Sequence, residues 1–296
     1  MKRIQSKLTG AFVVLLLFAA AVTTANSQPP GKTIDLNALA ARGEAIVNAD
    51  PDPLVLELRN QQPEGPNQRG FYIGMAIAEG HTLPGPGKDR ICASLPRGES
   101  QECSIAVSLS VDRNRNADLA ARGAAIAKTD PLVARARTMV LARPRDPNNP
   151  NPDRRSPDVL YTLGFDIGMA AAEGQTAPGP GKQKIHDALS LRAQGGFATA
   201  VTFSLERNRN ADFAARGAAI AEQDTTGNLA AARTAKTDVL YWLGFDIATG
   251  IFGDPALGAQ GNTATGPGSL KIRDSLSAAG QMGFNASVTF HLSRKY

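Results

Sequence analysis

AARGAAIA at Ala120–Ala127 is the stretch that decides the fold, because it returns at Ala214–Ala221 and, as AARGEAIV, at Ala40–Val47. Two further motifs recur in the same order. The first is LYTLGFDIG at Leu160–Gly168, with LYWLGFDIA at Leu240–Ala248 and a fainter copy at Gly70–Gly74. The other is GPGKQKI at Gly179–Ile185, with GPGKDRI at Gly85–Ile91 and GPGSLKI at Gly266–Ile272. Such self-similarity predicts one supersecondary unit copied three times.

The spacing of apolar residues in these motifs is typical of helices. Leu119, Gly123 and Ile126 lie at i, i+4 and i+7, which places them on one face, and alanine, the best helix former, fills most of the remaining positions. The second motif is apolar nearly all round, which predicts a helix buried between others. We therefore expect a mainly α protein of three degenerate helical repeats packed side by side, over 36–116, 117–210 and 211–296.

The last element of each unit leaves two interpretations open. Residues 105–111, 197–205 and 284–292 alternate apolar residues with small or polar ones, which is typical of a β-strand. The same segments also fit a helical line, since Phe197, Val201 and Leu205 are four apart. The alternative fold is therefore α+β, with one short strand in each repeat.

The N-terminus has the composition of a secretory signal peptide. Lys2, Arg3 and Lys7 precede the apolar run Ala11–Ala21, and cleavage is expected near Ala25. This gives a signal peptide over 1–25 and a linker over 26–35. A membrane anchor is the competing interpretation, but the run is shorter than the roughly 20 residues that a spanning helix needs. The mature chain is expected to be exported, to the periplasm or outside the cell, with no membrane span.

Charge argues against nucleic acid as a partner. The whole chain carries 32 basic and 27 acidic residues, a net charge of +5, and loss of the three signal-peptide cations leaves 29 against 27, or +2. Proteins that hold nucleic acid are usually strongly and locally basic. The densest basic stretches, Arg113–Arg115 and Arg207–Arg209, are interrupted by asparagine, and we expect them to be solvated turns between units.

The two cysteines, Cys92 and Cys103, are expected to form one disulfide that holds the loop 93–102. They are too few for a structural zinc site, which takes four ligands. The GPGK strings lack the spacing and the following Ser or Thr of a phosphate-binding loop. We therefore expect no metal and no cofactor.

Few residues are candidates for chemistry. Asp166 and Asp246 occupy matching positions in the second motif, where the first unit has Tyr72. Two carboxylates that met between the second and third units would provide acid–base catalysis, as in a hydrolase. The competing interpretation is that each aspartate pairs with an arginine or a backbone amide.

The packing residues are triplicated and the reactive ones are not, which favours a non-catalytic protein. We expect a binding or structural role in the bacterial cell envelope or outside the cell, with an envelope or extracellular protein or glycan as partner. We expect this role to use the loops between the second helix and the GPG turn of each unit, and the inserted loops Arg143–Pro157 and Gly253–Thr265 are the segments to mutate. The alternatives are the hydrolase and a small-ligand-binding module, whose pocket Tyr161, Tyr241 and Trp242 would line.

Overall fold

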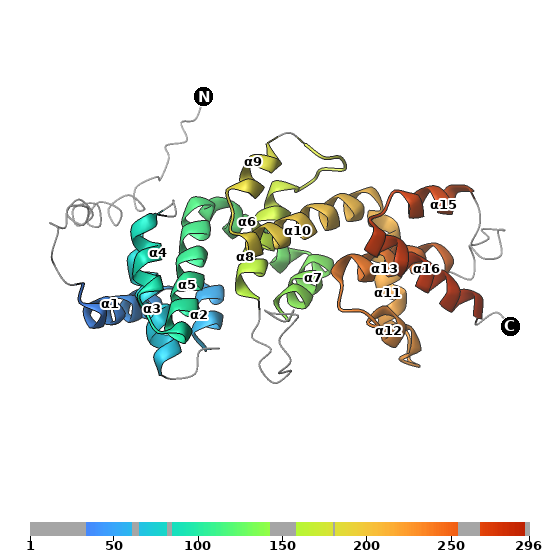
Figure 1. The fold of residues 1–296 in the computed structure, drawn as a ribbon. Coiled ribbons are helices and arrows are strands. Elements are labelled where there is room, and N and C mark those ends of the chain that lie inside the picture. The colour runs from blue at the N-terminus through green and yellow to red at the C-terminus, as the bar shows by residue number, and fades with distance from the viewer. Residues whose placement is uncertain are drawn as a thin grey trace, which may run out of the picture. The chain divides into compact units, whose positions relative to one another are not determined.

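A computed structural model describes residues 34–60, 65–81, 85–142, 158–179, 181–253 and 267–293, and these contain helices and no strands (Figure 1). The mainly α prediction is confirmed. The described helices, in chain order, are α1 (Leu36–Ala49), α2 (Pro53–Asn60), α3 (Pro66–Ala78), α4 (Pro86–Ala93), α5 (Arg97–Arg115), α6 (Ala117–Thr129), α7 (Pro131–Leu141), α8 (Val159–Ala171), α9 (Lys182–Asp187), α10 (Leu191–Arg209), α11 (Ala211–Glu222), α12 (Asn228–Arg233), α13 (Val239–Phe252), α15 (Pro267–Asp274) and α16 (Ala278–Ser293).

Some predictions fall outside these residues. The expected signal peptide over 1–25, most of the linker, the loop Arg143–Pro157 and all but the first residue of Gly253–Thr265 are among them. Within the described ranges, the structure contains no helix with the length and apolar character needed to cross a membrane. The boundaries 36–116, 117–210 and 211–296 stay predictions.

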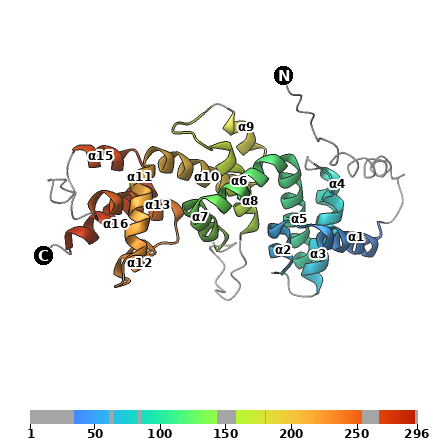
Figure 2. The ribbon, with the colours of Figure 1, turned by 180° about the vertical axis from the view of Figure 1, so that it is seen from behind.

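The second motif forms the most buried helices. Every residue from Val159 to Ala170 in α8 is buried, and α13 is buried almost as completely. Helix α8 packs against α6 and α10, and α13 packs against α11 and α16, while α3 packs against α5 (Figures 1 and 2). The prediction of an apolar helix held between others is confirmed.

Glycine allows these helices to touch at their backbones. A Cβ added to Gly43, Gly123 or Gly217 would lie 1.8 Å from the carbonyl oxygen of Tyr72, Asp166 or Asp246, respectively. Real side chains do not approach so closely, so the glycine of the AARG motif is required by the contact with the central helix. A glycine in a helix interior costs about 0.5–1 kcal/mol relative to alanine, and the close packing offsets that cost.

The strand alternative is wrong, because residues 105–111, 197–205 and 284–292 all lie in helices, α5, α10 and α16. Small residues explain the outcome. In α10 the side that faces the central helix carries Ala193, Gly196, Ala200 and Ser204, spaced three or four apart. That helical spacing of small buried residues decides the conformation, and the apolar alternation along the same segment is incidental.

The predicted disulfide between Cys92 and Cys103 is present, with the two Cα atoms 5.5 Å apart. It joins the end of α4 to α5, so residues 93–102 are mostly helical and not the loop that we expected. His186 and Phe197 occupy the matching positions in the second unit, and their ring centroids lie 5.9 Å apart. The disulfide therefore replaces a side-chain contact between the same two helices.

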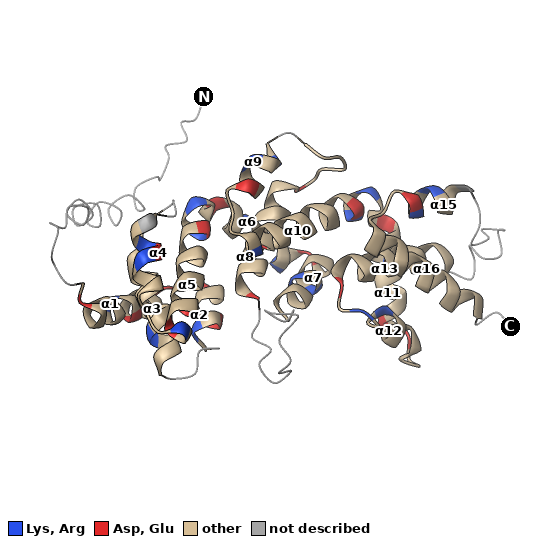
Figure 3. Ribbon diagram, viewed as in Figure 1, with Lys and Arg blue, Asp and Glu red and all other residues tan. Residues whose placement is uncertain are grey.

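The Arg-Asn stretches are not solvated turns. They end α5 and α10, and a single asparagine separates each from the next helix. Asn114 donates to the carbonyl oxygens of Ala78 and His81, and Asn208 donates to that of Gln175 at 2.8 Å. Basic residues stand beside acidic ones at both helix ends (Figure 3). These stretches are hydrogen-bonded junctions: Arg113 and Arg207 pair with acidic side chains, and Arg209, although exposed, donates to the carbonyl oxygen of Thr176.

Two buried carboxylates continue these junctions. Asp112, in the last turns of α5, accepts the backbone N–H of Ser190 at 3.0 Å, next to the start of α10. Glu206, in the last turns of α10, accepts that of Ser277, next to the start of α16. An acceptor at a helix N-terminus satisfies one of its unpaired amides. Burial raises the pKa of both carboxyl groups, against the effect of these hydrogen bonds.

Candidate functional site

Asp166 lies in the middle of α8 and is paired with Arg137 of α7. The Arg137 Nε donates to the two carboxylate oxygens at 2.8 and 3.1 Å, and Nη2 donates to one of them at 2.9 Å. Asp130 caps α7, and its side chain accepts the N–H groups of Leu132 and Val133, which fixes the helix that carries the arginine. Burial raises the pKa of Asp166, and Arg137 acts in the opposite direction.

Asp246 occupies the matching position in α13 and is paired with Arg233 of α12. This pair is more deeply buried, since the side chains are 0% and 2% exposed. The Arg233 Nη2 donates to one carboxylate oxygen only. The other oxygen, Oδ1, and the Arg233 Nε have no hydrogen-bond partner among the described residues. Burial raises the pKa of Asp246 to about 6, against the attraction of Arg233 and Arg135.

The two aspartates are paired with different arginines. The charge of Asp52 also acts on Asp166, and those of Arg135 and Glu222 act on Asp246. Each carboxylate therefore has an arginine of its own, which is the competing interpretation that the sequence left open.

The arginine partners were not found from the sequence. Arg137 lies 29 residues before its aspartate, but Arg233 lies only 13 before its own, so the spacing hides the correspondence. In the first unit Tyr72 occupies the matching position; burial raises its pKa, Glu44 raises it further, and Arg59 of α2 acts in the opposite direction. The sequence signal that could have revealed these partners is the presence of an arginine in the second helix of each unit.

The three aromatic candidates are all buried. Tyr161 is 8%, Tyr241 5% and Trp242 0% exposed. The Tyr161 hydroxyl is hydrogen-bonded to the hydroxyl of Thr199. The Trp242 ring is stacked on Phe203, with the centroids 6.3 Å apart, and the guanidinium of Arg233 lies 4.8 Å from its centre. These rings pack in the core of the protein, and none of them lines the cleft described next.

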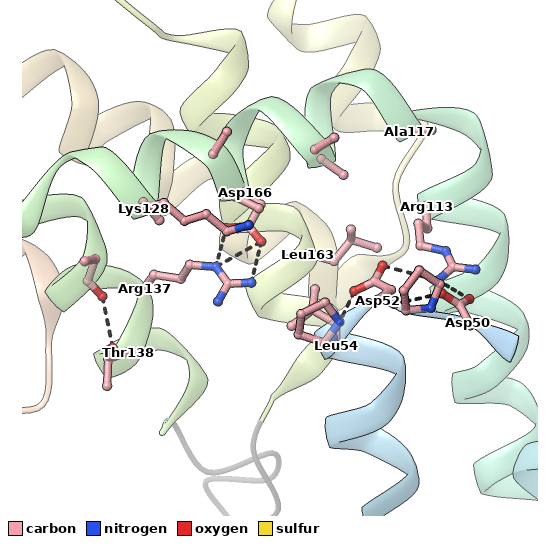
Figure 4. Close-up of a pocket in the computed structure, with 18 of the residues that line it drawn as sticks. Asp50, Asp52, Leu54, Arg113, Ala117, Lys128, Arg137, Thr138, Leu163 and Asp166 are labelled. Atoms are coloured by element: carbon pink, nitrogen blue, oxygen red, sulfur yellow. Dashed lines mark hydrogen bonds and ion pairs between the residues drawn. The ribbon is translucent and has the colours of Figure 1, made fainter. Parts of the chain in front are cut away.

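A cleft with a volume of about 650 Å³ lies between α6 and the residues that join α1 to α2 (Figure 4). One wall is the alanine face of α6, made of Ala117, Ala120, Ala121, Ala124, Ala125 and Ala127. Polar groups lie at its two sides, with Lys128, Arg137 and Asp166 on one and Asp50, Asp52 and Arg113 on the other (Figure 4). Of the predicted site residues, only Asp166 lines this cleft.

The acidic side of the cleft is a turn held by its own hydrogen bonds. The Asp50 Oδ1 accepts the N–H of Asp52 at 2.9 Å, and the Asp52 Oδ1 accepts that of Leu54, also at 2.9 Å, which caps α2. Their Oδ2 atoms share the Nη1 of Arg113, at 2.6 and 3.2 Å. One guanidinium thus faces two carboxylates. Asp52 also raises the pKa of Arg137 and that of Asp166, so the two sides of the cleft are within electrostatic reach.

Metal ligands are not gathered anywhere in the described ranges, since no three or more His, Cys, Asp or Glu residues there are grouped as a metal ion requires. Comparisons of the chain with protein-family models, with curated proteins and with solved structures find no match. The chemistry of the site therefore rests on its own geometry.

Proposed function

We propose that this chain is a non-catalytic binding protein, exported to the cell envelope or beyond it, and that the cleft beside α6 is its binding surface. The observation that carries the proposal is the contrast between the aspartates and the cleft. Both oxygens of Asp166 are occupied by Arg137, and Asp246 is sealed from solvent, whereas the cleft exposes charged groups around an apolar wall. Pockets that bind small molecules usually combine an apolar lining with a few polar groups.

A hydrolase that uses Asp166 and Asp246 is the weaker proposal. Two carboxylates that share one reaction lie within about 10 Å of each other and reach a common substrate. Here each has its own arginine, and a general base must also be within hydrogen-bond reach of the substrate proton. The disulfide between Cys92 and Cys103 supports export, because disulfides persist in oxidising compartments.

The test compares two tryptophan substitutions at matched positions. Ala121 in α6 is exposed and lines the cleft, and Ala215 occupies the same place in the AARG motif of α11, exposed but outside the cleft. Tagged Ala121→Trp, Ala215→Trp and unaltered protein are purified from their own cell envelope, and bound molecules are identified by mass spectrometry. Thermal unfolding of each variant shows whether the fold is kept.

We expect a stoichiometric partner or ligand on the unaltered protein and on Ala215→Trp, and its loss from Ala121→Trp. A folded Ala121→Trp protein that keeps the partner would contradict the assignment of the cleft. Hydrolytic turnover that vanishes in a folded Asp166→Asn or Asp246→Asn variant would contradict the non-catalytic role.

A further inference from the structure

We infer that the cleft beside α6 binds a short peptide with a free amino end and a free carboxyl end, an inference that rests on the proposed binding function. The argument comes from the distribution of charge. Lys128, Arg137 and Asp166 together carry a net charge of +1, and Asp50, Asp52 and Arg113 together carry −1. The cleft is therefore neutral as a whole but has a positive side and a negative side (Figure 4).

The positive side of the cleft is lined by two cationic side chains, Arg137 and Lys128. Arg137 binds Asp166 through Nε and Nη2, and no hydrogen bond within the described residues uses its Nη1. The Arg137 side chain is 23% exposed at the cleft. Lys128 is exposed at the end of α6 and belongs to no ion pair in the described part of the chain. A guanidinium N–H and an ammonium group together suit a carboxylate.

The negative side suits an ammonium group. Asp50 and Asp52 are held in place by the turn and by Arg113, so their free lone pairs are already oriented before a ligand arrives. Each oxygen of a carboxylate accepts more than one hydrogen bond, and an ammonium group offers three donors. Asp50, Asp52 and Arg113 together keep a net charge of −1, so this side of the cleft attracts a cation.

The wall between the two sides selects the shape of the ligand. Alanine methyl groups from α6 offer no hydrogen-bonding side chain, so a bound molecule is recognised at its ends and packs against methyl groups in between. The volume of about 650 Å³ lies within the roughly 300–1,000 Å³ of small-molecule sites. A peptide of two or three small residues matches this arrangement, because it has a charged group at each end and an apolar segment between them.

The test is isothermal titration calorimetry of the full chain with tri-alanine as the probe. Its N-acetylated and C-amidated forms each remove one terminal charge and keep the shape. We expect each modification to weaken binding by about tenfold or more, because it removes the terminal charge and with it a charge-assisted hydrogen bond. In the Lys128→Gln variant, tri-alanine and its C-amidated form should bind with nearly equal affinity. In the Asp50→Asn variant, tri-alanine and its N-acetylated form should bind with nearly equal affinity.

Lys184→Gln is the matched control for charge, since Lys184 is exposed on α9 and does not line the cleft. It should bind tri-alanine and its modified forms as the unaltered protein does. Modified peptides that bind as tightly as tri-alanine, or equal losses in Lys184→Gln and Lys128→Gln, would overturn the inference. The absence of any binding by tri-alanine would also overturn it.

The two proposals fail separately. If Ala121→Trp loses a native partner but no form of tri-alanine binds, the binding function stands and the peptide assignment is wrong. If Ala121→Trp keeps its partner and tri-alanine does not bind, both are wrong.

Discussion

Replacement of Arg233 by methionine should destabilise the protein by about 3 kcal/mol at pH 7, because it leaves Asp246 as a buried carboxylate with no hydrogen bond. Loss of one partner of a buried ion pair usually costs about 3–5 kcal/mol. Asp246 limits the cost by taking up a proton. Since burial raises the pKa of Asp246 to about 6, protonation at pH 7 costs only about 1.4 kcal/mol in the unaltered protein.

One further loss brings the total to the expected value. The guanidinium of Arg233 lies 4.8 Å from the centre of the Trp242 ring, and a desolvated contact of this kind contributes about 2 kcal/mol. The loss of the Arg233 hydrogen bond to Asp246 is already included in the cost of protonating that carboxylate. The cost should shrink as the pH falls from 7 to 4, because the unpaired carboxyl group is then protonated in the folded protein without penalty.

Urea denaturation at pH 7 and pH 4.5 measures these free energies of unfolding. Arg135→Met is the control, since Arg135 also lies over Trp242, at 5.4 Å, but makes no hydrogen bond to Asp246. Arg135→Met should lower the free energy of unfolding by less than about half as much as Arg233→Met does. The double variant Arg233→Met with Asp246→Leu should recover most or all of the stability, because a well-packed apolar pair avoids the desolvation of both charges.

A cost below about 1 kcal/mol for Arg233→Met at pH 7, or a double variant no more stable than the single one, would refute this reasoning. Either result would mean that the carboxylate is stabilised by something other than its arginine, and Asp246 would again be a candidate for chemistry.

Gly123→Ala should destabilise the protein by about 2–3 kcal/mol in urea denaturation, since its Cβ would lie 1.8 Å from the Asp166 carbonyl oxygen, whereas Gly87→Ala, with open space around it, should stabilise it by about 0.5–1 kcal/mol. Equal changes in the free energy of unfolding for Gly123→Ala and Gly87→Ala would contradict the close contact between Gly123 and the Asp166 carbonyl. Replacement of Cys92 and Cys103 by alanine should cost roughly 2–3 kcal/mol, and His186→Ala at the matching position should cost less than half of that in the same measurement. Burial raises the pKa of Glu206 in the folded state, so its contribution to stability falls as the pH rises; relative to the unaltered protein, Glu206→Gln should therefore gain stability between pH 4 and pH 7. A relative loss over that range would contradict the sign of the shift.

Helix content could be predicted from the sequence because the motifs have helical spacing on their own. The contacts of Gly43, Gly123 and Gly217 with the central helices explain why a glycine stands at the centre of AARG on its apolar face. The conformation of 197–205 could not be predicted, since a segment with both small residues at helical spacing and apolar residues at alternate positions satisfies two periods. Only the contact of Ala193 and Ala200 with α8 decides between them.

The cleft could not be predicted, because none of its polar residues stands out by itself. Asp50 and Asp52 belong to a turn, Lys128 ends a helix, and Arg113 lies in a stretch that we expected to be solvated. They come together only because α6 and the turn between α1 and α2 line the same cleft, an arrangement without a sequence motif. Sequence repetition drew attention to Asp166 and Asp246 instead, which recur in two of the three copies and are each paired with an arginine, as residues that stabilise the packing are.

Tyr72 supports this view of the aspartates. It occupies their position in α3, and its backbone carbonyl meets Gly43 as those of Asp166 and Asp246 meet Gly123 and Gly217. The same backbone contact is therefore made whether the side chain at this position is a phenol or a carboxylate. A catalytic carboxylate would not be interchangeable with a phenol, whereas a packing residue with a polar end is. The first unit therefore supports a packing role for the two aspartates.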